Sequence, residues 1–185
     1  MSAVTVDLTY PEGERNRLTV GLRMFTAIPH LFVSQMWGYL AQALTVVQWF
    51  IVLFTGKRNH GIFEMQQTWL GYSARALSYA WMLHDVFPPF STDPGAVPVR
   101  TSVTMDQEAN RLTAALRVLW LIPAALFVAI LSIGAFFVMV ISWFAVLFTG
   151  NQSRGMWDFV AKVFRYVVRT QAYAYLMTDT YPKYE

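Results

Sequence analysis

The sequence of 185 residues contains no cysteine and is poor in charge. The absence of cysteine excludes disulfides, iron–sulfur clusters, thiolate metal sites and a cysteine nucleophile. Charged residues make up 14%, against roughly 25% in an ordinary soluble domain, and hydrophobic residues make up 56%. Residues 24–55 and 118–149 carry no charge at all. Both stretches exceed the ~18 residues that mark a transmembrane candidate, so the composition predicts an integral membrane protein.

The N-terminal segment also lacks the features of a cleavable signal peptide. It has no apolar core, and it contains Asp7, Glu12 and Glu14. We therefore expect the N-terminus to be retained and the first membrane segment to direct insertion. All 14 Lys and Arg lie outside the two uncharged stretches. In a membrane protein this distribution indicates basic loops held in the cytoplasm rather than a surface that binds nucleic acid. We expect no nucleic-acid partner.

The chain repeats itself. WFIVLFTGKRNHG near the middle returns as WFAVLFTGNQSRG, and a shift of 94 positions aligns residues 16–90 on 110–184 without a gap. Roughly a third of these positions are identical, including polar ones outside the apolar stretches, which indicates an internal duplication. The predicted organisation is a first unit at residues 1–90, a linker at 91–98 and a second unit at 99–185.

Each unit has the same predicted order of elements. A short strand pattern comes first, with alternating apolar residues at 4–10 and again at 97–105. Asn16 or Asn110 then begins a helix as N-cap, and the apolar stretch follows. We expect Gly56 and Gly150 to end these stretches as left-handed caps. Amphipathic helices at 61–83 and 155–177 are predicted to lie at the membrane surface. The fold class is thus an all-α integral membrane protein with two repeats.

The number of times each apolar stretch crosses the membrane does not follow directly from its length. A continuous helix over residues 16–55 would be about 60 Å long, twice the ~30 Å hydrocarbon core. We favour a hairpin in each unit, with far turns at residues 37–39 and 132–134. Basic residues flank both ends of both stretches, and the two strands can pair only if they share one side of the membrane. The alternative is one long span per unit, with the halves oppositely oriented.

These motifs resemble a known family. The helix start with Arg, the Ile-Pro within the apolar stretch, Leu-Phe-Thr-Gly and the closing Asp-Val-Phe-Pro-Pro-Phe are similar to the bacterial membrane family called domain of unknown function 4389. Both units match, although Lys183 and Tyr184 replace Pro89 and Phe90 in the second. The resemblance implies membrane embedding and a bacterial envelope location, and we expect a multi-pass protein of the cytoplasmic membrane. It implies no activity.

Catalytic signals are weak throughout. None of His30, His60 and His84 has a histidine at the equivalent position of the second unit, and no metal-ligand spacing, phosphate loop or serine nucleophile motif occurs. The carboxylates shared by both units lie where caps and ion pairs are expected. We therefore expect no catalytic residues, cofactor or metal.

Two groups of residues are candidates for binding. The arginines shared by the units are expected at headgroup depth, where they would contact lipid or an acidic partner: Arg17, Arg23, Arg75, Arg111, Arg117 and Arg169. Polar residues found only in the first apolar stretch are expected to contact a partner helix: His30, Gln35, Gln42 and Gln48. The predicted partners are membrane lipids and other membrane subunits. The predicted function is that of an accessory or scaffolding subunit, and the alternative is a component of small-solute or lipid transport.

Overall fold

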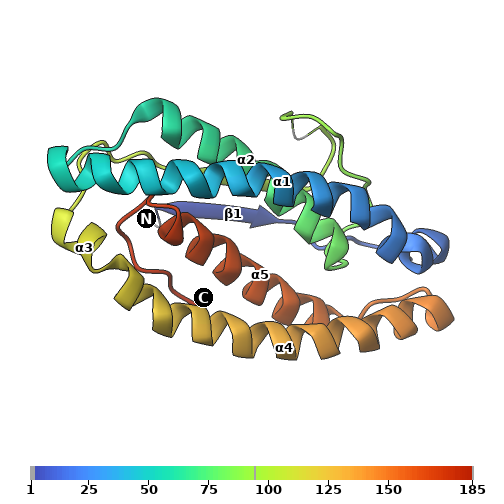
Figure 1. Cartoon of the computed structure of the whole chain (residues 1–185). Helices are drawn as coiled ribbons and strands as arrows, with labels where there is room; N and C mark the ends of the chain where they lie inside the picture. The colour runs from blue at the N-terminus through green and yellow to red at the C-terminus, as the bar shows by residue number, and fades with distance from the viewer. Residues whose placement is uncertain (1–2, 94, 185) are drawn as a thin grey trace.

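The structure is a computed structural model that describes residues 3–93 and 95–184. Two long helices run across the molecule, with shorter helices and a strand pair between and beside them (Figure 1). In chain order the elements are β1 (Val4–Leu8), α1 (Arg17–Thr55), α2 (His60–Ala80), β2 (Val99–Val103), α3 (Arg111–Ala115), α4 (Arg117–Thr149) and α5 (Arg154–Ala174).

The two strands form an antiparallel pair, as the alternating pattern predicted. Val4 lies opposite Val103, and Leu8 lies opposite Val99. The valines on one face are buried against α2 and α5, and the intervening residues are exposed. The period of two in the sequence therefore sets which face of this small sheet covers the core.

The predicted hairpin within each apolar stretch is wrong, because α1 and α4 are each one continuous helix. The glycines taken for turns are close-packing points. A Cβ on Gly38 would lie 3.3 Å from the Trp69 ring nitrogen, and one on Gly134 would lie 3.5 Å from Phe159. The return of the chain is made instead by α2 and α5, which pack back along α1 and α4, so the strands can still pair.

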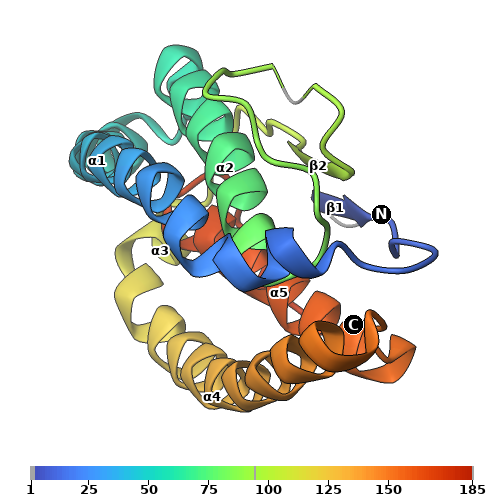
Figure 2. The same ribbon diagram turned by 90° about the vertical axis from the view of Figure 1, so that its right-hand side faces the viewer.

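The shorter helices lie in the interior, which corrects their predicted place at the membrane surface. In Figure 2, α2 lies between α1 and the two strands. Trp69 and Tyr72 of α2, and Phe164 and Tyr173 of α5, are buried against other protein segments. Both helices end about three residues earlier than predicted, at turns in which Met82 and Leu176 have a φ of 61°. The amphipathic pattern was read correctly, but its apolar side meets protein.

The two units interlock. β1 opens the first unit but packs on α5 of the second, while β2 opens the second unit and packs on α2 of the first. The long helix of each unit also contacts the first helical turns of the other unit. Trp143 of α4 donates a ring N–H to the carbonyl of Val20 in α1 at 3.0 Å, and Trp49 of α1 donates to that of Ala114 in α3 at 2.9 Å. These pairs are related by the 94-residue shift, so the duplicated chain forms a fused, pseudo-twofold dimer.

The helix ends follow the sequence closely. Asn16 and Asn110 accept side-chain hydrogen bonds from the backbone N–H of Thr19 and Thr113, as N-caps do. Gly56 and Gly150 follow the last residues of α1 and α4 with φ values of 71° and 77°. The repeated Leu-Phe-Thr-Gly phrase is therefore the end of a long helix with a left-handed glycine cap.

Candidate functional site

An apolar outer surface covers the two long helices. Its exposed large hydrophobic side chains lie on α1, α3 and α4, and a few more lie in the segments that close each unit. Among the described residues, no exposed large hydrophobic side chain lies on α2, α5 or either strand. We call this the apolar face. By length and composition, α1 and α4 are each able to cross a membrane.

Apart from Arg17 and Arg111, which begin α1 and α3, the exposed charges among the described residues lie outside the three helices of the apolar face. Examples are Asp7 and Arg100 on the strands, Glu64 on α2 and Lys162 on α5. Within residues 24–55 and 118–149 there is no charged side chain to interrupt the apolar face. The molecule is therefore strongly divided into an apolar side and a polar side.

A buried ion-pair centre forms where the first unit closes. Asp85 accepts two hydrogen bonds of 2.7 Å from Arg15, and it also pairs with Arg23. Burial alone would raise the pKa of Asp85, but the hydrogen bonds and charge of Arg15, together with the charge of Arg23, lower it. The carboxylate thus remains ionised and ties the closing segment to the start of α1.

The second unit builds the same centre with a different donor. Asp179 pairs with Arg117, the counterpart of Arg23, and with Arg58 at 2.7 Å. Arg58 comes from the other unit, whereas Arg15 comes from the same unit as Asp85. The positions equivalent to Arg15 and Arg58 under the 94-residue shift are Ala109 and Gln152. Each aspartate therefore keeps two arginines, although the chain supplies them differently.

The predicted headgroup arginines separate into two kinds. Arg23 and Arg117 are only 2% and 3% exposed and are committed to aspartates, so they are interior residues rather than contacts for headgroups. Arg17 and Arg111 are exposed beside Gly150 and Gly56. The headgroup or partner contact stays a prediction for these two residues.

The last two of the predicted arginines hold loops. Arg75 donates to the carbonyl of Ser91 at 2.8 Å, and Arg169 donates to that of Lys183 at 3.0 Å. Arg75 thus ties the residue after the first closing motif to α2, and Arg169 ties a residue of the second closing motif to α5.

The polar residues of the first apolar stretch also divide. His30 is fully buried, hydrogen-bonds the Tyr72 hydroxyl at 3.0 Å and stacks on Phe90. Gln48 is buried and accepts the N–H of Asn59, the N-cap of α2. These two residues serve the fold. Gln35 and Gln42 lie two helical turns apart and are exposed on the apolar face, so they remain the candidates for a partner-helix contact.

Two clefts open on the apolar face between α1 and α4. They have volumes of about 460 and 310 Å³. The larger is lined by Met24, Ala27 and Trp143 among others, the smaller by Val118, Leu121 and Trp49 among others. Every residue of the smaller cleft has its counterpart, 94 positions away, in the larger one. The clefts are thus a symmetric pair produced by the duplication.

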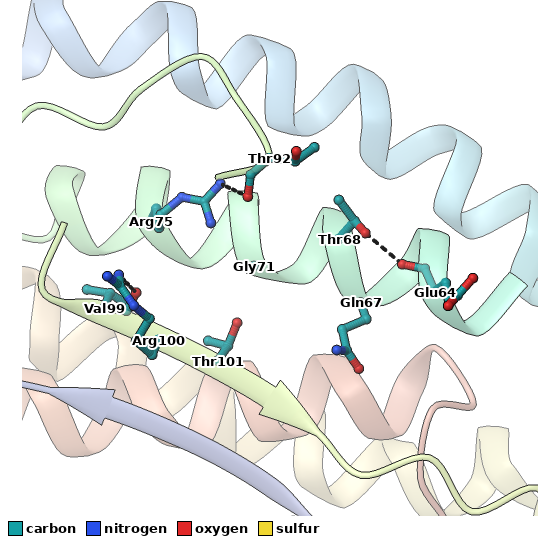
Figure 3. A pocket seen from close by; sticks show the side chains of 9 residues that line it. All are labelled: Glu64, Gln67, Thr68, Gly71, Arg75, Thr92, Val99, Arg100 and Thr101. Atoms are coloured by element: carbon teal, nitrogen blue, oxygen red, sulfur yellow. Dashed lines mark hydrogen bonds between the residues drawn. The ribbon is translucent and has the colours of Figure 1, made fainter. Parts of the chain in front are cut away.

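A third cavity, of about 520 Å³, lies on the polar side between α2 and β2 (Figure 3). We call it the polar pocket. Arg75 and Arg100 lie at one end and Glu64 at the other, with Gln67 and threonine hydroxyls between them. It differs from the two clefts in the chemistry of its walls.

The chain was compared with known families and proteins. The profile of the family described as Domain of unknown function (DUF4389) matches residues 17–92 and again 111–184. The chain belongs to this family. It contains two tandem DUF4389 copies, as the sequence motifs predicted. No curated protein and no solved structure matches the chain.

The first DUF4389 copy starts at the first residue of α1 and ends at residue 92, and the second starts at the first residue of α3 and ends at residue 184. The copies therefore include Asp85 and Asp179 and their partners Arg23 and Arg117, but neither strand. Arg15, the second partner of Asp85, lies just outside the first copy. A search for residues identical in the two units does not identify Arg15 or Arg58, because neither is an arginine in the other unit.

Within residues 3–93 and 95–184, no group of three His, Asp or Glu is placed to hold a metal ion. His84, beside Asp85, hydrogen-bonds Ser78 rather than the carboxylate, at 3.0 Å. Burial, and then the positive charge of Arg23, lower the pKa of His84 to about 4.

Proposed function

We propose that this protein is a non-catalytic membrane module, which anchors in the bacterial cytoplasmic membrane and serves as an accessory or scaffolding subunit of a larger envelope complex. The apolar face carries the proposal. It extends over helices of 39 and 33 residues, whereas soluble monomers rarely expose apolar patches larger than a few hundred Å². Lipid is the solvent in which such a surface is stable.

The distribution of charge supports a placement along the membrane rather than across it. The middle of α1 packs on the middle of α2, where Trp69 donates to the carbonyl of Ser34 at 3.0 Å. β2 lies on the other side of α2, since a Cβ on Gly71 would be 3.6 Å from Thr101. If α1 crossed the bilayer, the strand charges Asp7 and Arg100 would lie near its centre.

The cost of that arrangement is large. A charge at the centre of the hydrocarbon costs about 2.5–3.5 kcal/mol or more, and Asp7 and Arg100 are accompanied by Glu64 and Lys162 on the neighbouring helices. With α1 and α4 lying in the plane, the apolar face enters one leaflet and every one of these charges stays in water. We therefore favour the in-plane placement over the multi-pass topology expected from sequence.

Single cysteines test the placement, because the natural chain has none. Glu12→Cys and Lys57→Cys flank the two ends of α1 and are exposed. An in-plane protein reacts with a membrane-impermeant maleimide at both positions from the same side of sealed vesicles. Phe137→Cys, in the exposed middle of α4, serves as the protected control. Labelling of Glu12→Cys and Lys57→Cys from opposite sides would show that α1 spans the bilayer.

The membrane assignment itself has a separate test. Vesicles washed with alkaline carbonate should keep the protein, since the apolar face is buried in lipid. Release into the supernatant would remove the basis of the proposed function, whatever the labelling pattern of the cysteines.

The symmetric clefts favour a second candidate function, the binding and transport of lipid. Both clefts open on the apolar face, and apart from one buried arginine each is lined almost entirely by apolar side chains, which suits an acyl chain. Protein purified in detergent and analysed by native mass spectrometry should then retain up to two phospholipids. Transfer of fluorescent lipid between vesicles would distinguish transport from static binding.

A further inference from the structure

The polar pocket contains two arginines that lack acidic partners. Arg75 is 5% exposed and uses one nitrogen to donate to the carbonyls of Ser91 and Thr92, at 2.8 and 3.3 Å. Its Nε is buried without a hydrogen-bond partner. Arg100 donates to the carbonyls of residues 95, 97 and 99. Among the described residues, neither guanidinium makes an ion pair with a carboxylate.

This arrangement contrasts with the other buried arginines. Arg15, Arg23, Arg58 and Arg117 each pair with Asp85 or Asp179. Burial, and then the charge of Arg100, lower the pKa of Arg75, so the two cations oppose one another. An anion between them would relieve this repulsion and satisfy the unused donors, as phosphate does in bidentate contacts with arginine.

The other residues that line the polar pocket indicate which further groups a ligand would carry. Gln67 directs a side chain toward the space between α2 and β2, and its Oε1 is buried without a partner (Figure 3). Thr101 adds a hydroxyl from β2. Three acids face the site from different elements: Glu64 at the far end of α2, Asp93 in the loop beside Arg75, and Asp7 opposite Arg100 on β1. The negative charges of these acids restrict the anion to the end of the pocket with the two arginines. In the rest of the pocket, their carboxylates can accept hydrogen bonds from ligand hydroxyl groups.

The second unit has different residues at the corresponding positions. Gly71 corresponds to Arg165, whose Nε donates to the carbonyl of Val6 at 3.3 Å, and Gln67 corresponds to Ala161. Burial, and then the charge of Arg169, lower the pKa of Arg165, while the charges of Asp158 and Asp7 act in the opposite direction. In the first unit, Gly71 lines the polar pocket at the position where the second unit has an arginine side chain.

We propose that the polar pocket is a binding site for a phosphate-bearing, hydroxyl-rich small molecule, with its phosphate between Arg75 and Arg100 and its hydroxyl groups toward Gln67 and Thr101. The phosphate belongs either to a free ester or to a phospholipid headgroup. This inference is independent of the accessory role, because it concerns the polar side of the molecule.

The test measures binding to the purified full chain in detergent by isothermal calorimetry. The probes are glycerol 3-phosphate and inorganic phosphate, and, separately, vesicles of phosphatidylglycerol compared with phosphatidylcholine. We expect the ester to bind with greater affinity than inorganic phosphate. A preference for phosphatidylglycerol vesicles without binding of the free ester would assign the site to headgroups.

Two variants define the site, and each has a matched control. Gly71→Arg places in the pocket the residue that the second unit already has, and the control is Arg165→Gly, which leaves the polar pocket untouched. Arg100→Gln removes one cation, and Lys162→Gln removes an exposed cation elsewhere. We expect Gly71→Arg and Arg100→Gln to weaken binding about tenfold or more, the effect of losing one charge-assisted contact, and the controls to bind normally.

The proposal is overturned by any of three results. These are no binding of either phosphate source by the natural chain at millimolar concentration, equal affinity in the Gly71→Arg variant, or an equal loss in the Lys162→Gln control. Thermal melting of each variant establishes that it is folded. If Gly71→Arg does not fold, the binding measured for Arg100→Gln, a change at an exposed position, tests the proposal.

Discussion

The backbone N–H of Arg15 donates a hydrogen bond of 2.8 Å to the carbonyl oxygen of Gly150. Its counterpart joins Ala109 to Gly56 at 2.9 Å. Each glycine cap therefore ends one long helix and receives the chain that begins the other. The repeated phrase is a joint between units as well as a stop signal, which gives a physical reason for its presence in both copies.

Replacement of Gly150 by valine should destabilise this joint. The φ of 77° is strained for a residue with a Cβ, and the added atom would lie 3.3 Å from the Arg17 guanidinium. We expect a loss of about 1–3 kcal/mol, seen as a lower melting temperature in detergent. The control is Gly155→Ala, at the start of α5, where a Cβ meets no atom closer than 4.0 Å. An unchanged melting curve for Gly150→Val would contradict the role given to the cap.

Neutralisation of Asp85 should lower the free energy of unfolding by more than the Gly150→Val change. Asp85→Asn leaves Arg15 and Arg23 buried without an anion, and breaking a buried pair on one side costs about 3–5 kcal/mol. We expect a large fall in the melting temperature, or failure to accumulate folded protein. Asp106→Asn, at an exposed position, should behave like the natural chain. A small effect at Asp85 would mean that the ion-pair centre does not hold the closing segment.

Much of this architecture was predictable. The duplication, the strand pair, the asparagine N-caps and the glycine caps all follow from local patterns, and local patterns persist in the structure. The hairpin prediction was wrong, because a glycine such as Gly38 within an apolar run is compatible either with a turn or with a close approach to an aromatic ring. Only the position of Trp69 decides between them.

The ion-pair centres show a second limit. Arg58 reaches Asp179 across 121 residues and two units, and no spacing rule connects such residues. A signal was nevertheless present, because the units exchange arginine for a neutral residue in a complementary way. The Asp85 centre contains Arg15 and Gln152. The equivalent positions in the Asp179 centre are Ala109 and Arg58, so the arginine and the neutral residue are exchanged. Internal comparison that looks for compensation, rather than identity, would have found it.

Stability should also depend on pH through His84. Its pKa is lowered to about 4 in the folded protein, from an ordinary value of 6.5. Between these values the unfolded chain binds a proton that the folded chain does not, so the stability present above pH 6.5 is lost as the pH falls toward 4. The loss amounts to about 3 kcal/mol.

Chemical denaturation at several pH values measures this effect. His84→Thr carries the residue found at the same place in the second unit, Thr178, and should flatten the curve between pH 6.5 and 4. His60→Gln, at an exposed position, should leave the slope unchanged. Below this range, protonation of Asp85 adds a further loss, because its pKa is also lowered in the folded state. An equal slope in His84→Thr would show that another group carries the dependence.

The last prediction concerns the exposed glutamines of α1. Gln35 and Gln42 lie on one stripe of the apolar face, where an amide is costly unless it meets a polar group of a neighbour. The second unit has Ala129 and Phe136 at the same places, also exposed. We therefore expect the first unit to make the specific contact with a partner subunit and the second to provide anchorage.

The experiment replaces Gln35 and Gln42 by leucine together, since interhelical polar contacts in membranes average only about 0.6 kcal/mol each and one change could go undetected. Ala129 and Phe136 are replaced by leucine as the matched pair. Partners that co-purify from detergent extracts are compared by quantitative mass spectrometry. We expect the glutamine pair to lose a defined subset that the matched pair retains. If instead the second-unit changes release the partner while the glutamine changes do not, the contact belongs to α4, and the polar stripe of α1 has another cause.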